Sequence, residues 1–173
     1  MNVSNFPRRV MLCVTGMSPQ IVTETLYALV VEQSFIPTEI RIITTVQGRN
    51  KIIGELLDPV HGHFWGFCKE YGLMNCIAFT EAHISVIEDA CGAALPDIRT
   101  LDENNLAADF IARIVRTLCA DSQSVVHASI AGGRKTMGFY LGYALSLFAR
   151  PLSFRQRCIC RLNQFLASGR HQV

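Results

Sequence analysis

The sequence has few charged residues and lacks the long apolar run of a membrane protein. Only 17% of its 173 residues are charged and half are apolar, so the chain can bury a core and disorder is not expected. The longest apolar stretch, residues 137–149, is shorter than the roughly 20 residues that cross a bilayer. These absences predict a soluble, globular chain outside the membrane.

The chain also lacks a strong charge of either sign. Its formal net charge is +2, and no run of aromatic residues alternates with basic ones. A broad basic surface for long nucleic acids is therefore not expected. If an anion binds, it binds at a local site.

The cysteines have neither a disulfide framework nor a metal-binding spacing. There are seven cysteines, and none of them forms a CxxC pair. Cys13 lies inside an apolar run near the start of the sequence, but Gly16 ends this run, which is then too short for a secretory segment. His61 and His63 precede Cys68, but no fourth metal ligand accompanies them. We predict a reduced, cytoplasmic protein with no metal and no cofactor.

Apolar runs alternate with segments of helical spacing along the chain. The runs predict strands at 9–16, 39–46, 75–80 and 124–130, with 83–89 as one strand of a hairpin. Helices are expected at 17–33, at 50–72 with a break near Asp58, after Asp102, and at 134–149. This alternation predicts an α/β, Rossmann-like fold with a mostly parallel sheet flanked by helices. Ligands of such sheets bind beyond the carboxyl ends of the strands.

Two helix starts carry recognisable signals. Ser18 is predicted to be an N-cap, with Pro19 at the first helical position. Asp102 is predicted to cap a later helix, whose buried face would contain Leu106, Phe110, Ile114 and Leu118.

The stretch SIAGGRKT, residues 129–136, joins a predicted strand to a predicted helix. Gly132 and Gly133 let the backbone turn tightly and approach a ligand, and the helix start directs free N–H groups at an anion. Arg134, Lys135 and Thr136 add two cations and a hydroxyl. The alternative is a glycine turn with two solvated cations. The stretch is neither a P-loop nor GxGxxG, which argues against a dinucleotide-binding oxidoreductase.

Two further polar segments lie just before predicted helices. TGMSPQ, residues 15–20, offers Thr15 and Ser18 at a helix start, although capping by Ser18 alone would explain them. Asp97, Arg99 and Thr100 form a compact cluster ahead of a helix. They constitute either a surface ion pair and a turn, or a loop that folds over a ligand.

Three separated strings, SIAGGRKTMGFYLGYALSLFARP, VTGMSPQIVTETLYAL and DIRTLDENNLAADFI, resemble the CRISPR-associated ring nuclease family. The domain of that family, CARF (CRISPR-associated Rossmann fold), also forms the sensor half of certain type III CRISPR ribonucleases. The resemblance covers residues 9–150 and implies a CARF domain over 1–150. It implies a homodimer that binds cyclic oligoadenylate, most readily cyclic tetra-adenylate, across its interface. It assigns catalysis to Lys135 and Ser18, and ligand binding to Thr15, Gly16, Gly132, Gly133, Arg134, Thr136, Arg99, Asp97, Thr100 and Asn104.

The activity implied by the resemblance is cleavage of the ring without a metal. Attack by a 2′-hydroxyl would give linear di-adenylate with a 2′,3′-cyclic phosphate and switch off type III CRISPR signalling. Lys135 and the helix start would stabilise the developing charge. The alternative is a module that senses or sequesters the ring without cutting it, such as the CARF part of a ribonuclease effector without its HEPN domain.

The chain departs from the family in two ways. It has no R-x(4–6)-H motif of a HEPN ribonuclease domain, so we expect a stand-alone or truncated CARF unit. Residues 151–173 contain four arginines and no acidic residue, and do not resemble the usual continuation. We predict that a frameshift or truncation produced this atypical tail.

Overall fold

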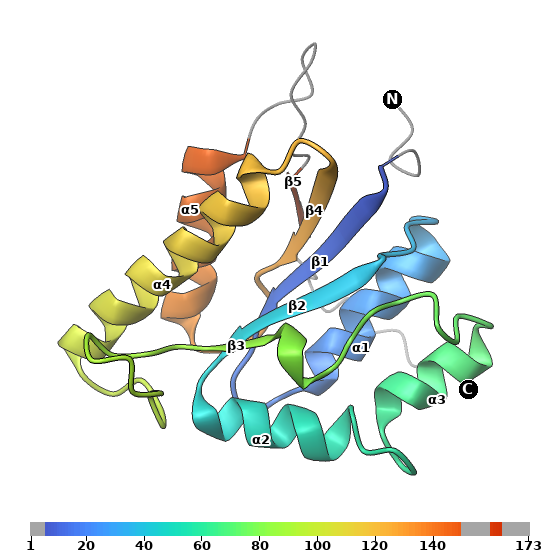
Figure 1. The fold of residues 1–173 in the computed structure, drawn as a ribbon, viewed down its shortest axis with the longest axis horizontal. Coiled ribbons are helices and arrows are strands. Elements are labelled where there is room, and N and C mark those ends of the chain that lie inside the picture. The colour runs from blue at the N-terminus through green and yellow to red at the C-terminus, as the bar shows by residue number, and fades with distance from the viewer. Residues whose placement is uncertain (1–5, 150–159, 164–173) are drawn as a thin grey trace, which may run out of the picture.

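A computed structural model describes residues 6–149 and the strand 160–163. It contains a five-stranded sheet in the order β3-β2-β1-β4-β5, and every neighbouring pair is parallel (Figure 1). The strands are β1 (Arg8–Val14), β2 (Glu39–Thr44), β3 (Ile84–Val86), β4 (Ser124–Ser129) and β5 (Cys160–Asn163). The α/β, Rossmann-like prediction is confirmed. Apart from β5, the predicted atypical tail 151–173 lies outside the described residues.

Helices cover both faces of the sheet. One face carries α1 (Gln20–Tyr27), its π-helical continuation η2 (Ala28–Glu32), α2 (Val46–Glu55) and α3 (His63–Glu70), and the other carries α4 (Leu101–Ala120) and α5 (Lys135–Phe148) (Figure 1). Alternate residues of β1 supply the two cores: Met11 packs in the first and Leu12 in the second. Within the described ranges, no helix is both long and apolar enough to cross a membrane.

The third predicted strand, 75–80, is wrong in extent. Ala78 forms a single parallel bridge with Glu39, and the short 3-10 helix η3 (Glu81–His83) then ends the pairing. The next segment supplies β3, which pairs with β2. The predicted hairpin is reduced to one antiparallel bridge between Glu88 and Ala94.

Both predicted N-caps are one or two residues away from the observed ones. Helix α1 begins at Gln20 after Pro19, without a side-chain cap, so Ser18 lies outside the helix. Helix α4 begins after Thr100, whose side chain accepts a hydrogen bond from the Glu103 N–H in a capping box. Asp102 lies within the first turn instead, because Thr100 and Glu103 satisfy each other's backbone donors.

The buried face of α4 is wider than predicted. Phe110 and Leu118 are buried as expected, whereas Leu106 and Ile114 are half-buried. The remaining buried positions of the helix are Ala107, Ile111, Val115 and Cys119.

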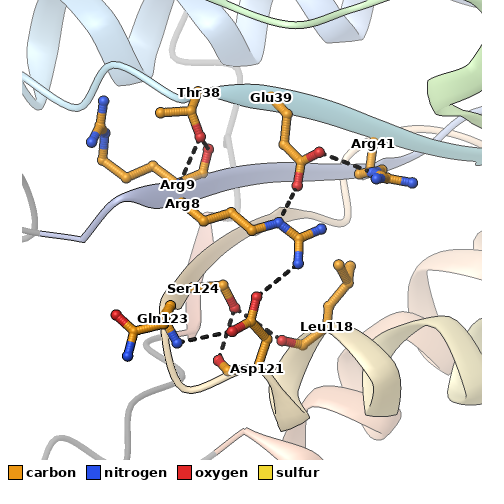
Figure 2. A network of polar contacts seen from close by, with 9 residues as sticks. All are labelled: Arg8, Arg9, Thr38, Glu39, Arg41, Leu118, Asp121, Gln123 and Ser124. Carbon is orange, nitrogen blue, oxygen red and sulfur yellow. Dashed lines mark hydrogen bonds and ion pairs between the residues drawn. The ribbon is translucent and has the colours of Figure 1, made fainter.

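A polar network ties together the starts of β1, β2 and the turn before β4 (Figure 2). The guanidinium of Arg8 donates from Nε to Glu39 Oε1 at 2.6 Å and from Nη1 to Asp121 Oδ2 at 2.8 Å. Arg41 contacts the other oxygen of Glu39 at 3.2 Å. Because the side chain of Glu39 is only 12% exposed, its carboxylate has lost most of its contact with water, and these two guanidinium groups take the place of that water.

Changing Arg8 to glutamine is expected to lower the free energy of unfolding by about 2 kcal/mol, since two charge-assisted hydrogen bonds are lost. Urea unfolding of the wild type and variant measures this difference. Arg116→Gln is the control, because Arg116 lies on the exposed side of α4 and has no polar partner among the described residues. An equal loss in both variants would contradict the role of the network.

The pH dependence of this effect has a defined sign. The bond from Arg8 lowers the pKa of Asp121, with help from the Gln123 N–H. A carboxylate with a lowered folded-state pKa stabilises the fold above its unfolded pKa of about 3.9, and this contribution disappears as the pH falls further. The stability difference between wild type and Arg8→Gln should therefore narrow below about pH 4.

Candidate functional site

A pocket of about 380 Å³ lies beyond the carboxyl ends of β1 and β4. These strands are neighbours, but α1 follows β1 to one face of the sheet and α5 follows β4 to the other (Figure 1). The loops therefore diverge and leave a crevice, as at the switch point of other doubly wound sheets. The lining comprises Gly16, Met17, Ser18, Gln20, Ile21, Glu24, Thr45, Gln47, Asp97, Ile98, Ala131, Gly132, Gly133, Arg134 and Met137.

The turns after β1 and β4 approach each other closely because glycines lie at their contact. A Cβ atom on Gly132 would lie 2.5 Å from the carbonyl oxygen of Val14 and 2.9 Å from Cγ2 of Ile21. Gly133 has a φ of +76°, which residues with a side chain rarely adopt. The glycines predicted from the sequence therefore do shape this site.

Changing Gly132 to alanine is expected to lower the free energy of unfolding by about 2 kcal/mol, because the new methyl group meets backbone that cannot move alone. Thermal unfolding is the measurement. The matched control is Gly54→Ala in α2, where a Cβ meets nothing within 4 Å and helix propensity favours alanine. If Gly132→Ala were as stable as Gly54→Ala, the two turns would have room to separate.

Thr15 stabilises the turn after β1 through hydrogen bonds. It is fully buried, its hydroxyl donates to the Ser18 carbonyl at 3.1 Å, and its carbonyl accepts from Thr44 Oγ1 at 2.7 Å. Its hydroxyl is thus used within the protein and does not line the pocket. Ser18 and Gly16 do line it, and Ser18 is exposed.

An ion pair joins the loop before α4 to the turn before α5. Arg134 donates to both carboxylate oxygens of Asp97, from Nη2 at 2.7 Å and from Nε at 3.2 Å. This pairing lowers the pKa of Asp97, aided by the Ile98 N–H and by Arg99. Asp97 and Arg134 line the pocket, whereas Arg99 lies beside Asp97 with a side chain that is 72% exposed. Asp97, with the neighbouring Ile98, thus forms one side of the pocket.

Thr100 and Asn104 serve the start of α4 and do not line the pocket. Besides capping the helix, Thr100 offers its carbonyl to Nδ2 of Asn104 at 2.8 Å. Their predicted contact with a ligand therefore has no counterpart in the lining of this pocket.

Lys135 lies in the first turn of α5 and faces a different groove. This second groove, of about 490 Å³, is lined by Ile130, Lys135, Gly138, Phe139, Gly142 and Tyr143. Thr136 is exposed and lines neither hollow. The GGRKT turn thus separates two concave surfaces, with Arg134 on one and Lys135 on the other.

Sequence reasoning missed the part of the pocket that comes from α1 and α2. Gln20 and Glu24 lie four residues apart and so share one face of α1, and Gln47 comes from the first turn of α2. The signal for Gln47 was available: it follows the end of β2, which neighbours β1. For Gln20 and Glu24 the signal was their place just after Ser18 and Pro19. They lie in the first turns of α1, and exposed residues there border a site at the carboxyl end of β1.

The histidines and the cysteine in the segment 61–68 do not form a metal site with neighbouring side chains in the described part of the chain. Among the described residues, no three His, Cys, Asp or Glu side chains gather in a way that could hold a metal ion. Cys68 is buried in α3, within the core on that face of the sheet.

Comparison with known proteins shows that most of the chain matches one family model. The family model described as CRISPR-associated protein NE0113 matches residues 18–153, which include Ser18, Asp97 and the whole GGRKT turn. Among curated proteins, none matches the chain.

Proposed function

The chain belongs to the CRISPR-associated NE0113 family, and from this premise we propose that it binds cyclic tetra-adenylate and cleaves it without a metal ion. The observation that carries the proposal is the meeting of two turns, TGMSPQ and GGRKT, in one pocket at the switch point between β1 and β4. Gly132 and Gly133 have no side chains, so a phosphate can approach the backbone of this turn. Arg134 supplies a planar cation next to the turn. Cleavage would remove a signalling molecule of type III CRISPR immunity.

The proposed chemistry needs only alignment and charge stabilisation. A 2′-hydroxyl attacks the phosphorus of its own 3′-phosphate, and the bond from phosphorus to the 5′ oxygen of the next adenylate breaks. The hydroxyl proton passes to solvent and the leaving oxygen takes a proton from solvent, which leaves a 2′,3′-cyclic phosphate and a 5′-hydroxyl. Two such cuts give two linear di-adenylates. The pocket aligns the attacking and leaving oxygens, and Lys135 with the start of α5 stabilises the phosphorane charge.

A homodimer completes the proposed site. A pocket of about 380 Å³ is at the small end of ligand pockets, so a ring of four nucleotides needs a second copy to enclose it. Helix α5 offers the surface: Phe139, Tyr143 and Leu147 are 68%, 59% and 59% exposed, and the two aromatic rings stack at 6.3 Å. Because Lys135 adjoins this face, a dimer through α5 brings the lysines of both copies towards the shared ring.

A second candidate function is binding of the ring without cleavage. The observation that favours it is the position of Lys135, which lies outside the lining of the main pocket in the single chain. In this case the protein senses or sequesters the messenger, and Arg134 supplies affinity alone.

Incubating cyclic tetra-adenylate with excess protein in EDTA tests both candidates. Linear di-adenylate with a 2′,3′-cyclic phosphate, separated by chromatography, is expected for the nuclease. An intact ring that co-elutes with the protein would support the second candidate instead. A ring that neither binds nor breaks would overturn both.

A further inference from the structure

Arg134 lines the pocket between β1 and β4, and only one edge of its guanidinium is paired with Asp97. Asp97 Oδ2 accepts from Nη2 at 2.7 Å, and Asp97 Oδ1 accepts from Nε at 3.2 Å. These two contacts use the side edge of the guanidinium. The remaining N–H groups, on Nη1 and Nη2, form its outer edge, and no described residue accepts a hydrogen bond from them.

The loop that carries Asp97 gives the carboxylate a fixed position. Leu95 and Ile98, on either side of Asp97, are only 7% and 1% exposed. The carbonyl groups of Leu95 and Pro96 accept hydrogen bonds from the first two N–H groups of α2. The N–H of Ile98 donates to Asp97 Oδ1 at 2.8 Å. The carboxylate is therefore placed by its own loop before any ligand binds.

Stability alone does not account for the pair of Asp97 and Arg134. The side chain of Arg134 is 50% exposed and that of Asp97 is 22% exposed, and ion pairs in contact with water add little to the free energy of unfolding. Arg134 is also the N-cap residue of α5, where its side chain caps no N–H and a positive charge opposes the helix dipole. A cation fixed at such a place suits the binding of an anion.

We propose that Asp97 is a positioning residue, which holds the side edge of the Arg134 guanidinium so that the outer edge faces a phosphate on the GGRKT turn. This inference rests on the proposed function. The outer edge can donate two parallel hydrogen bonds to two phosphate oxygens. An arginine side chain that is already held in place loses less freedom when the ligand binds, which strengthens binding. Asp97 acts only through Arg134, and it takes no part in bond breaking.

A double-mutant cycle tests this proposal. Dissociation constants of cyclic tetra-adenylate are measured for the wild type, Asp97→Asn, Arg134→Gln and the double variant, and chromatography checks that the recovered ring is intact. Asp97→Asn is expected to weaken binding by about five- to tenfold, because one long side chain must then become ordered on binding. Arg134→Gln is expected to weaken binding by about tenfold or more, because the charged donors are lost.

The double variant distinguishes a positioning role from a structural one. It should bind the ring within about twofold of Arg134→Gln, because Asp97 then has no guanidinium to hold. If Asp97 served only the structure of its loop, its loss would weaken binding by the same factor with and without Arg134.

The matched control is Asp89→Asn, which removes the same charge from the same loop at a position outside the pocket lining. Asp89 accepts hydrogen bonds from the N–H groups of Cys91 and Ala93, both at 2.8 Å, so it serves the loop itself. This variant should bind the ring within about twofold of the wild type. An equal loss in Asp89→Asn and Asp97→Asn would overturn the inference, because order of the loop would then explain both.

Three further results would overturn the inference while the proposed function stands. An Asp97→Asn variant that binds as tightly as the wild type, or more tightly, would mean that the carboxylate does not help Arg134 or competes with the phosphate for it. A double variant outside the expected range would mean that Asp97 acts independently of Arg134. An Arg134→Gln variant that binds as the wild type does would remove the arginine from the site. A wild type that does not bind the ring overturns the proposed function, and the inference with it.

Discussion

Changing Lys135 to alanine is expected to lower the rate constant of the proposed ring cleavage by about 100-fold or more, the usual cost of removing one group that stabilises transition-state charge. The dissociation constant of the ring should change by no more than about threefold, because the glycine turn, Arg134 and the α1 side of the pocket remain. Single-turnover cleavage and equilibrium binding, measured separately, provide the two values.

Lys69→Ala is the matched control, because Lys69 is an exposed lysine at the end of α3 and does not line the main pocket. It should behave as the wild type in both measurements. Lys135→Arg adds a further comparison, since it keeps the charge but not the compact ammonium group. Equal losses in binding and in rate for Lys135→Ala would mean that the lysine holds the ground state only. Unchanged cleavage would remove Lys135 from the mechanism.

The local features of the site were predictable because their signals are short in sequence. Glycines before a cationic pair predict a tight turn, and alternating strands and helices predict where such a turn lies relative to the sheet. Gly132, Gly133 and Arg134 accordingly line the pocket. Helix starts were less predictable, because several residues near each start can cap it. Thr100 prevails over Asp102 because Glu103 lies three positions after Thr100 and completes a capping box.

Contacts between distant segments were not predictable from local signals. Asp97 and Arg134 are 37 residues apart, and their pairing depends on how the loop before α4 crosses the sheet edge. The sequence suggested instead a pair between Asp97 and its neighbour Arg99, which exists as a weaker contact of 3.3 Å. The placement of Lys135 has a local cause instead. Arg134 is the extended N-cap of α5 and Lys135 is the first helical residue, so the two adjacent cations point in different directions and line different hollows.

The exposed face of α5 connects these observations to the proposed dimer. Arg134 and Lys135 lie on the two sides of one turn, and only the groove of Lys135 continues into the aromatic face of the helix. Gly142 lies in that groove, and nothing lies within 4 Å of the position that a Cβ atom would take there, so another backbone can approach. A second copy that packs here covers the apolar side chains and extends the pocket at once. Dimerisation and catalysis are then one structural requirement, which a single substitution can test.

Changing Phe139 to aspartate is expected to disrupt the proposed homodimer and to abolish the proposed ring cleavage. A buried aromatic residue at an interface contributes about 2 kcal/mol or more, and the substitution occurs twice in a two-fold interface. The combined cost of about 4 kcal/mol raises the dissociation constant of the dimer by about 1,000-fold. Sedimentation measures the state of association, and chromatography of the ring measures cleavage on the same samples.

The control for this variant is Val60→Asp, which places the same charge at a 79% exposed apolar position in the loop between α2 and α3. It should keep the state of association and the cleavage rate that are measured for the wild type. A monomeric Phe139→Asp protein that cleaves at the wild-type rate would contradict the shared site, since one chain would then hold and break the ring alone. A variant that stays dimeric but is inactive would locate the interface elsewhere and assign Phe139 to contact with the ring, beside Lys135 in the same groove.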